Sequence, residues 1–145
     1  MARIRFFSES IDFSIPRPLK VTRWIKDVIK KEGFVPGDLN FIFCDDDGLL
    51  EINVDFLDHD TYTDIITFDN SEEEGVIEGD IFISVDRIKE NAANLLLPFE
   101  DELHRVMIHG VLHLMGYKDK RPEEKKAMRE KEDACLELRN VPRGT

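Results

Sequence analysis

Two histidines stand four residues apart in the segment HGVLHLMGYKDK, which covers residues 109–120. In a helix, side chains at positions i and i+4 lie on the same face, so His109 and His113 would point the same way. Their neighbours are mostly apolar, and a buried imidazole must be hydrogen-bonded or bound to a metal ion. The pair is therefore either two satisfied core histidines or two metal ligands, because His-x3-His is a recurrent zinc-binding spacing.

A third ligand is available just beyond this segment. Gly116 can take the left-handed conformation that ends a helix and turns the chain back, which would carry Asp119 toward the histidine face. Three protein ligands leave one position open on a four-coordinate zinc ion, as in catalytic rather than structural sites. We therefore predict that His109, His113 and Asp119 are both the metal ligands and the catalytic residues. They would hold one Zn²⁺ ion or another divalent metal; the alternative for Asp119 is a solvated loop carboxylate.

The same spacing occurs in the zinc-peptidase helix, whose pattern is H-E-x-x-H. Here the residue after the first histidine is Gly110, so the glutamate that serves as general base in those enzymes is missing. A peptidase would have no proton acceptor at that position. The sequence thus disfavours peptide hydrolysis.

Apolar patterns predict the elements that would position this site. We expect strands at residues 3–7, 39–44, 64–68 and 76–85. Helices are expected at residues 18–33, 49–56, 86–97 and 100–115, and from residue 122 onward. The helix at 100–115 is apolar on nearly every side, which is typical of a helix buried at the centre of a domain. These elements predict an α+β fold, with the metal site on a C-terminal helix and the turn after it.

Length and charge limit the classes of partner. The 145 residues suit one domain over residues 1–145, and the formal net charge of −11 disfavours nucleic-acid binding through overall charge. Basic residues nevertheless cluster at residues 17–31 and 118–131, which leaves an RNA-binding face open, whereas we expect no DNA partner. No apolar run approaches the roughly 20 residues that span a bilayer, and no signal peptide is recognisable. We therefore expect a cytoplasmic protein without a membrane partner.

Three segments resemble the YbeY family of metal-dependent endoribonucleases. HGVLHLMGYKD resembles the family signature HGxLHLxGYDH, and INVDFLDHDTYTDIITF (residues 52–68) resembles LN-x-x-[YF]-R-x-x-D-x-x-T-[DN]-V-L-S-F. GDIFIS (residues 79–84) resembles the family's GDIxIS strand. The resemblance covers most of the chain, in the family's order. It implies a mixed four-stranded sheet surrounded by helices, and a single-strand-specific endonuclease that acts in ribosomal RNA maturation and ribosome biogenesis. Ribosomal RNA, and ribosomal particles or proteins, are the implied partners.

Two positions depart from the family pattern. The family's third histidine falls on Asp119; a carboxylate keeps the coordination number but shifts metal preference toward harder ions such as manganese. The arginine suited to steadying a phosphate falls on Leu57, which cannot pair with a phosphoryl oxygen. Candidates to replace that arginine, by proximity to the ligands or to Leu57, are Lys118, Lys120, Arg121, Arg105 and His59.

Four further positions match the family or adjoin the site. Thr63 and Asp64 match its T-[DN] pair, and Asp64 would either support a ligand histidine or cap a turn. Asp80 is open to the same two interpretations. Tyr117 is expected to pack over the ligand turn, with its hydroxyl directed to solvent or substrate.

Two functions of other classes remain open from the sequence. One is a non-catalytic ribosome-assembly factor in which the metal only holds the C-terminal turn. The other is a metallohydrolase of another substrate, such as a small phosphoester. The absent arginine and the acidic charge favour the first, whereas the open ligand position favours an enzyme.

Overall fold

The computed structural model describes residues 2–57 and 63–140. Its core is a four-stranded sheet in the order β1–β2–β4–β3. The strands are β1 (Ile4–Ser8), β2 (Val35–Cys44), β3 (Ile65–Asp69) and β4 (Val76–Ser84). β1, β2 and β4 run parallel, and β3 pairs antiparallel with β4. The sheet is therefore mixed, and the α+β prediction is confirmed.

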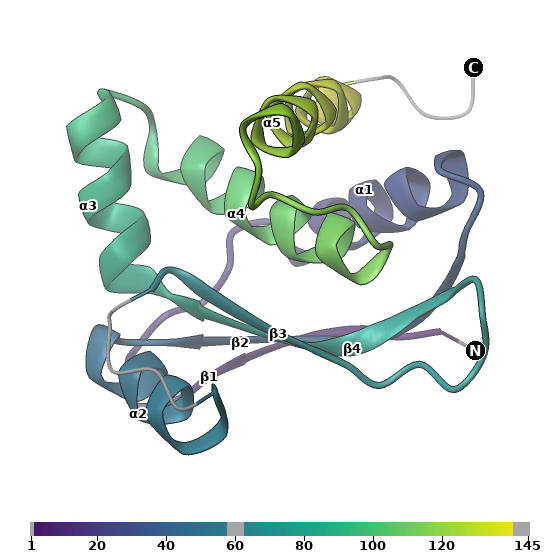
Figure 1. Cartoon of the computed structure of the whole chain (residues 1–145). Coiled ribbons are helices and arrows are strands. Elements are labelled where there is room, and N and C mark those ends of the chain that lie inside the picture. Colours follow the sequence, from purple (N-terminus) through teal and green to yellow (C-terminus); the bar gives the residue numbers. More distant parts are fainter. Residues whose placement is uncertain (1, 58–62, 141–145) are drawn as a thin grey trace.

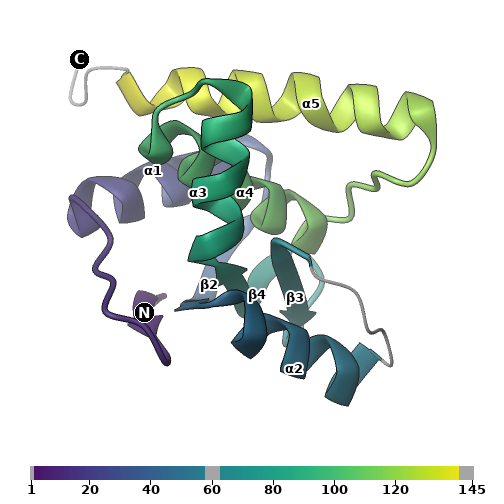
Figure 2. The same cartoon turned by 90° about the vertical axis from the view of Figure 1, so that its left-hand side faces the viewer.

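The helices form unequal layers on the two faces of the sheet (Figures 1 and 2). α1 (Pro18–Lys31) and α4 (Phe99–Leu114) cover one face, and α2 (Asp46–Leu57) covers the other. α5 (Pro122–Glu137) lies across α4 on the side away from the sheet and continues into a short 3₁₀ turn (Leu138–Asn140). α3 (Val85–Leu95) packs against α4 at one end of the sheet.

This layering follows from where the apolar side chains lie. α1 buries one stripe, made of Val21, Trp24, Ile25, Val28 and Ile29, as expected for a helix on a sheet. α4 lies between the sheet and α5, so it buries side chains on nearly all sides. The prediction of a centrally buried helix is therefore confirmed.

The element boundaries differ from the sequence-based expectation by more than two residues in two places. β2 begins at Val35 because Val35 and Pro36 pair with Val76 and Ile77, ahead of a register shift before Leu39. α2 begins at Asp46, and the Asp45 carboxylate accepts a hydrogen bond from the Gly48 amide at 2.7 Å. Side-chain capping of this kind favours helix over turn at the DDDG segment.

Within the residues that the structure describes, every helix is too short or too polar to cross a bilayer.

Candidate metal centre

The end of α4 and the turn after it bring the three predicted ligands together. The Nε2 atoms of His109 and His113 lie 3.0 Å apart. The Asp119 Oδ2 atom lies 3.2 Å from His109 Nε2 and 3.4 Å from His113 Nε2. Ligand atoms placed about 2 Å from one ion at tetrahedral angles are separated by about 3.3 Å, so these spacings fit a single metal ion. In the described ranges, this is the one group of three or more His, Cys, Asp or Glu side chains that converges in this way.

A helix-ending turn carries Asp119 to this position. Gly116 has φ +105°, and its amide donates to the His113 carbonyl while the Tyr117 amide donates to the Leu112 carbonyl. These two bonds form a Schellman motif, which favours glycine at its left-handed position. The sequence-based expectation for Gly116 is confirmed.

The Tyr117 hydroxyl has a partner within the fold that the sequence analysis did not identify. It donates a hydrogen bond of 2.7 Å to Glu32 Oε1, and Lys131 Nζ lies 3.2 Å from Glu32 Oε2. Glu32 is the residue that follows α1. The turn that carries Asp119 is thus tied to the end of α1 and to α5.

A glutamate that the sequence analysis missed lies directly behind the first histidine. The Nδ1 atom of His109 lies 2.6 Å from Glu132 Oε2, and the Glu132 side chain is only 6% exposed. The other oxygen of Glu132 accepts a hydrogen bond of 2.9 Å from Arg105. A carboxylate on Nδ1 places the ring proton there and leaves the Nε2 lone pair free to bind a metal. The missed signal was the position of Glu132 on α5, four residues after Met128 on the same buried face.

Negative groups dominate the electrostatics around His109. Burial acts to lower the pKa of His109, but the hydrogen bond and charge of Glu132, with Asp119 and Asp64, raise it above its ordinary value. Burial also raises the pKa of Asp64 and of Glu102. A cluster of carboxylates that attracts a proton to an imidazole attracts a metal cation for the same reason.

A cleft of about 340 Å³ opens beside the histidine pair. Its lining from α4 and α5 includes Arg105, Lys125 and Arg129, and Asp64 joins from the start of β3. It therefore lies mainly between α4 and α5, with the start of β3 at its border. The basic side chains give it groups that attract phosphate.

The structure separates the candidates that were to replace the family arginine. Arg105 lines the cleft, but its guanidinium is already bonded to Glu132 and, at 2.6 Å, to Asp133. Lys125 and Arg129, which the sequence analysis did not single out, line it as well. Three other candidates are not among the residues that line the cleft, and these are Lys118, Lys120 and Arg121. Leu57 ends α2, its side chain falls outside the described part of the chain, and so does His59.

The acidic candidates of the strands have different roles. Asp64 lines the cleft, whereas the hydrogen-bond partner of His109 is Glu132. Asp80 accepts hydrogen bonds from Asn40 at 2.9 Å and from Asn70 at 3.3 Å, so it ties β4 to its neighbours. Thr63 Oγ1 makes only a long contact, 3.5 Å, with the Ile65 carbonyl.

Gly110 explains why this helix cannot carry the peptidase glutamate. A Cβ atom at Gly110 would lie 2.8 Å from Ile65 Cδ1 and 3.1 Å from Ile81 Cγ2. The residue after the first histidine thus faces the sheet, and a carboxylate there would be buried among isoleucines. The geometry agrees with the sequence in disfavouring peptidase chemistry.

Comparisons with known proteins point in one direction. Residues 8–140 match the family model described as Endoribonuclease YbeY. The chain is 55% identical to "Endoribonuclease YbeY" of Cytophaga hutchinsonii, over 94% of this chain and 95% of that relative. It is 50% identical to the protein of the same name from Flavobacterium psychrophilum, over 93% and 96% of the two chains. The solution structure of TM1509 from Thermotoga maritima is 27% identical, with a TM-score of 0.67 over 99% of both chains.

Proposed function

The chain belongs to the YbeY family, whose members are metal-dependent endoribonucleases that hydrolyse RNA, and we propose that cleavage takes place at His109, His113 and Asp119. The observation that carries this proposal is the convergence of three ligand atoms within 4.8 Å of one another. The glutamate behind His109 and the basic side chains in the cleft beside it support the same assignment.

We infer that the metal is one Zn²⁺ ion per chain. Two imidazoles and one carboxylate form a donor set that zinc accepts, although the carboxylate also suits manganese. When bound, such an ion supplies Lewis-acid chemistry, lowering the pKa of a water molecule and polarising a phosphoryl oxygen.

The side chains of the cleft then have separable tasks. Glu132 holds the proton on His109 Nδ1 and fixes the ring, and Arg105 holds Glu132. Arg129 and Lys125 attract the RNA phosphates, in place of the arginine that Leu57 replaces. Asp64 and Glu102, whose pKa values are raised by burial, are the carboxyl groups of the cleft that hold a proton most readily.

For the substrate, we propose single-stranded segments of ribosomal RNA, free or within assembling ribosomal particles, in the cytoplasm. The family resemblance implies this setting. Three basic side chains at the cleft, in a chain that is acidic overall, favour a short contact with RNA over wide coverage of a duplex.

The direct test compares the wild-type protein with His113→Ala, purified identically and loaded with zinc or manganese. Cleavage of structured ribosomal RNA, RNA binding and metal content by mass spectrometry are measured on both. We expect the variant to lose metal and to cut at least about 100-fold more slowly while still binding RNA. Equal cleavage by both proteins would mean that the activity comes from elsewhere. Binding by both without cleavage would support the non-catalytic assembly factor instead.

Removal of the metal distinguishes a catalytic from a structural ion. A structural ion supplies folding free energy outright, so chelation would abolish cooperative unfolding. We expect the stripped protein to keep its fold, with a melting temperature lowered only by the loss of ligand binding. A small-phosphoester enzyme would be recognised by rapid hydrolysis of model phosphodiesters without RNA.

A further inference from the structure

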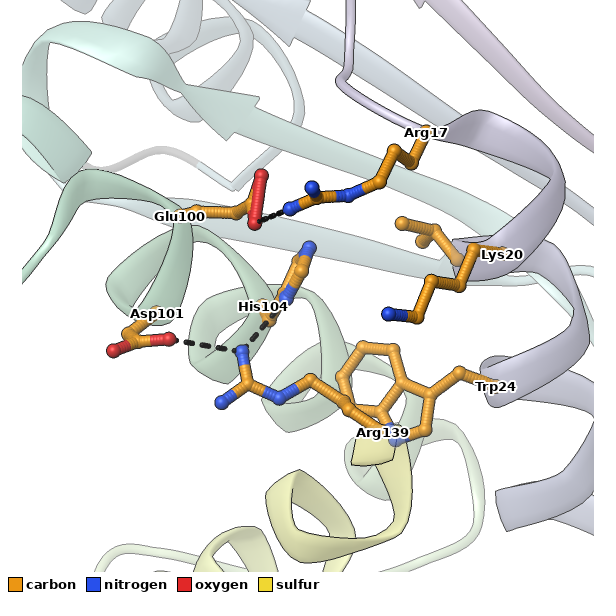
Figure 3. Close-up of a pocket in the computed structure, with 8 residues that line it drawn as sticks. Arg17, Lys20, Trp24, Glu100, Asp101, His104 and Arg139 are labelled. Carbon is orange, nitrogen blue, oxygen red and sulfur yellow. Dashed lines mark hydrogen bonds and ion pairs between the residues drawn. The ribbon is translucent and has the colours of Figure 1, made fainter. Parts of the chain in front are cut away.

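A second cavity, of about 170 Å³, lies between the first turns of α1 and α4 (Figure 3). Arg17 and Lys20 border it from α1, His104 borders it from α4, and Arg139 borders it from the 3₁₀ turn after α5. No described residue lines both this cavity and the metal cleft. The cavity is therefore a separate feature, reached from a different face of α4.

His104 presents an unpartnered donor in this cavity. Its side chain belongs to a residue only 7% exposed, and Arg139 donates a hydrogen bond of 2.8 Å to its Nδ1 atom. A guanidinium can only donate, so Nδ1 is the acceptor and the ring proton lies on Nε2. Within the described residues, Nε2 is buried without a hydrogen-bond partner. In Figure 3 this nitrogen points away from Arg139, toward the gap between Glu100 and Arg17.

The His104 ring stays neutral at ordinary pH. Burial, together with the charge of Arg139, lowers the pKa of His104 to about 4. The Nε2–H group is thus a permanent donor near pH 7, and a buried donor without an acceptor is unfavourable. An acceptor atom from a ligand would satisfy it.

The charged groups around this donor favour an anion. Three cationic side chains, Arg17, Lys20 and Arg139, face two carboxylates, Glu100 and Asp101. Arg139 is held to Asp101 at 3.1 Å, whereas Lys20 has no ion pair or hydrogen bond to any described residue. Figure 3 shows its ammonium group directed into the cavity.

The entrance can open at little cost. Arg17 is paired with Glu100, but the two side chains are 62% and 31% exposed, and ion pairs at the surface are weak. Arg17 can therefore exchange Glu100 for a ligand that carries more charge. Arg17 also precedes the 14-residue helix α1, whose first turn has no side-chain cap, so the positive end of the helix adds to the field.

We propose that this cavity binds a phosphate group, with the His104 Nε2–H group and the Lys20 ammonium donating to its oxygens. Arg17, released from Glu100, closes over the remaining oxygens. Three donors approaching from two elements, α1 and α4, suit a tetrahedral oxyanion, which has acceptors on every side, better than a planar carboxylate. The phosphate belongs either to a small molecule, such as inorganic phosphate or a phosphomonoester, or to an RNA chain held away from the metal cleft.

The test follows the imidazole nitrogens of the metal-free full chain by long-range ¹H–¹⁵N NMR. Inorganic phosphate is titrated at constant ionic strength, with chloride as the reference anion. We expect a saturable shift of His104 Nε2 in the wild type and in His113→Ala, since the metal cleft takes no part. His104→Gln, which keeps an N–H donor at this position, should retain phosphate binding by isothermal titration calorimetry, whereas His104→Leu should lose it.

Lysine variants provide a matched pair on the same helix. Lys20→Ala is expected to weaken phosphate binding at least about tenfold, since its ammonium donates to the anion. Lys30→Ala, an exposed lysine of α1 that does not line the cavity, should bind as the wild type does. Equal binding by the two variants, or a phosphate shift that never saturates, would overturn the proposal.

A second arm identifies the source of the phosphate. A short single-stranded RNA is added to the metal-free protein, with and without a 5′-phosphate, and the His104 signal is followed. A shift by both oligonucleotides assigns the site to the RNA backbone, and a shift by the 5′-phosphorylated one alone assigns it to a terminal phosphate. A response to inorganic phosphate but to neither RNA assigns it to a small phosphorylated molecule. No response to any of the three probes would overturn the proposal, whatever the outcome of the cleavage test at His113.

Discussion

Helix α4 carries two histidines, five residues apart, in opposite environments: His104 is buried and His109 is half-buried. His104 receives a hydrogen bond at Nδ1 from Arg139, and its pKa is lowered to about 4 by burial and that positive charge. His109 has Glu132 at Nδ1, and its pKa is raised although burial opposes the change. The two rings are chemically identical, so the difference comes entirely from their neighbours.

The group at Nδ1 determines what Nε2 can bind. Because an arginine donates a hydrogen bond to Nδ1 of His104, the Nε2 atom of that ring carries the proton and can donate to an acceptor. Because a carboxylate accepts the Nδ1 hydrogen bond of His109, the Nε2 atom of that ring carries a lone pair and can bind a cation. One helix thereby carries the proposed anion site near its beginning and the proposed metal site near its end. In both cases the residue that contacts Nδ1 comes from α5 or from the 3₁₀ turn after it, and not from α4 itself.

The strongest way to break this contrast is Glu132→Ala. The change leaves Arg105 and His109 without their buried acceptor, which costs about 3 kcal/mol or more of unfolding free energy. Loss of the support behind a ligand histidine should also weaken metal binding about 10–100-fold. Calorimetric zinc titration and urea unfolding measure the two effects.

Asp133→Asn is the matched control for Glu132→Ala. Asp133 bonds to the same arginine but is 56% exposed and does not touch His109. We expect zinc affinity close to that of the wild type. Equal losses in the two variants would show that Arg105, rather than the carboxylate on Nδ1, governs the ligand.

A change of pH tests the other half of this contrast, the lowered pKa of His104. The unfolded chain takes up a proton near pH 6.5, whereas folded His104 does so only near its pKa of about 4. The free energy of unfolding should therefore fall as the pH drops through this window, by up to about 3 kcal/mol from this group. His104→Gln should flatten the dependence. Urea unfolding at pH 7 and pH 4.5 tests this, and parallel curves for the two proteins would contradict it.

A substitution at Gly110, on a third face of α4, should have a smaller effect on stability. Gly110→Ala places a methyl group 2.8 Å from Ile65 Cδ1, and the tip of that side chain must move. We expect a loss of about 1–2 kcal/mol in thermal unfolding, with zinc affinity preserved if the sheet absorbs the change. A large drop in zinc affinity would mean that the spacing of α4 from β3 and β4 fixes the ligand geometry.

The smallest effect is expected at the entrance to the second cavity. Glu100→Gln removes the partner of Arg17, and a surface pair of this kind contributes at most about 1 kcal/mol. Chemical denaturation should show little change, while phosphate affinity should rise because Arg17 no longer has a competing carboxylate. A marked loss of stability would indicate that the pair holds the cavity closed.

The same contrast separates what the sequence can predict from what it cannot. Gly116 and the spacing of His109, His113 and Asp119 are local features, because helix periodicity and one turn bring them together. Whether Asp119 and the histidines bind a metal in the protein stays a prediction for the experiments above. The strands and helices were also locally encoded, apart from the early starts of β2 and α2.

The residues that contact Nδ1 of the two histidines could not be predicted from such local features. Glu132 and Arg139 reach α4 only because α5 crosses it, and no periodic pattern in either helix specifies that crossing. The partner of the Tyr117 hydroxyl was missed for the same reason, since Glu32 lies 85 residues away along the chain. Long-range polar pairs depend on packing angles, which composition and spacing do not encode.

The position of α5 in the chain also sets the order in which the molecule can mature. Every strand and α4 precede it, so a nascent chain can form the sheet and place α4 on it before Glu132 and Arg139 have been made. Until α5 docks, neither His104 nor His109 has the Nδ1 partner that distinguishes it, although Trp24 of α1 can already pack against His104. The arrival of the last helix and its following turn therefore fixes both tautomers together, and with them the proposed anion and metal sites.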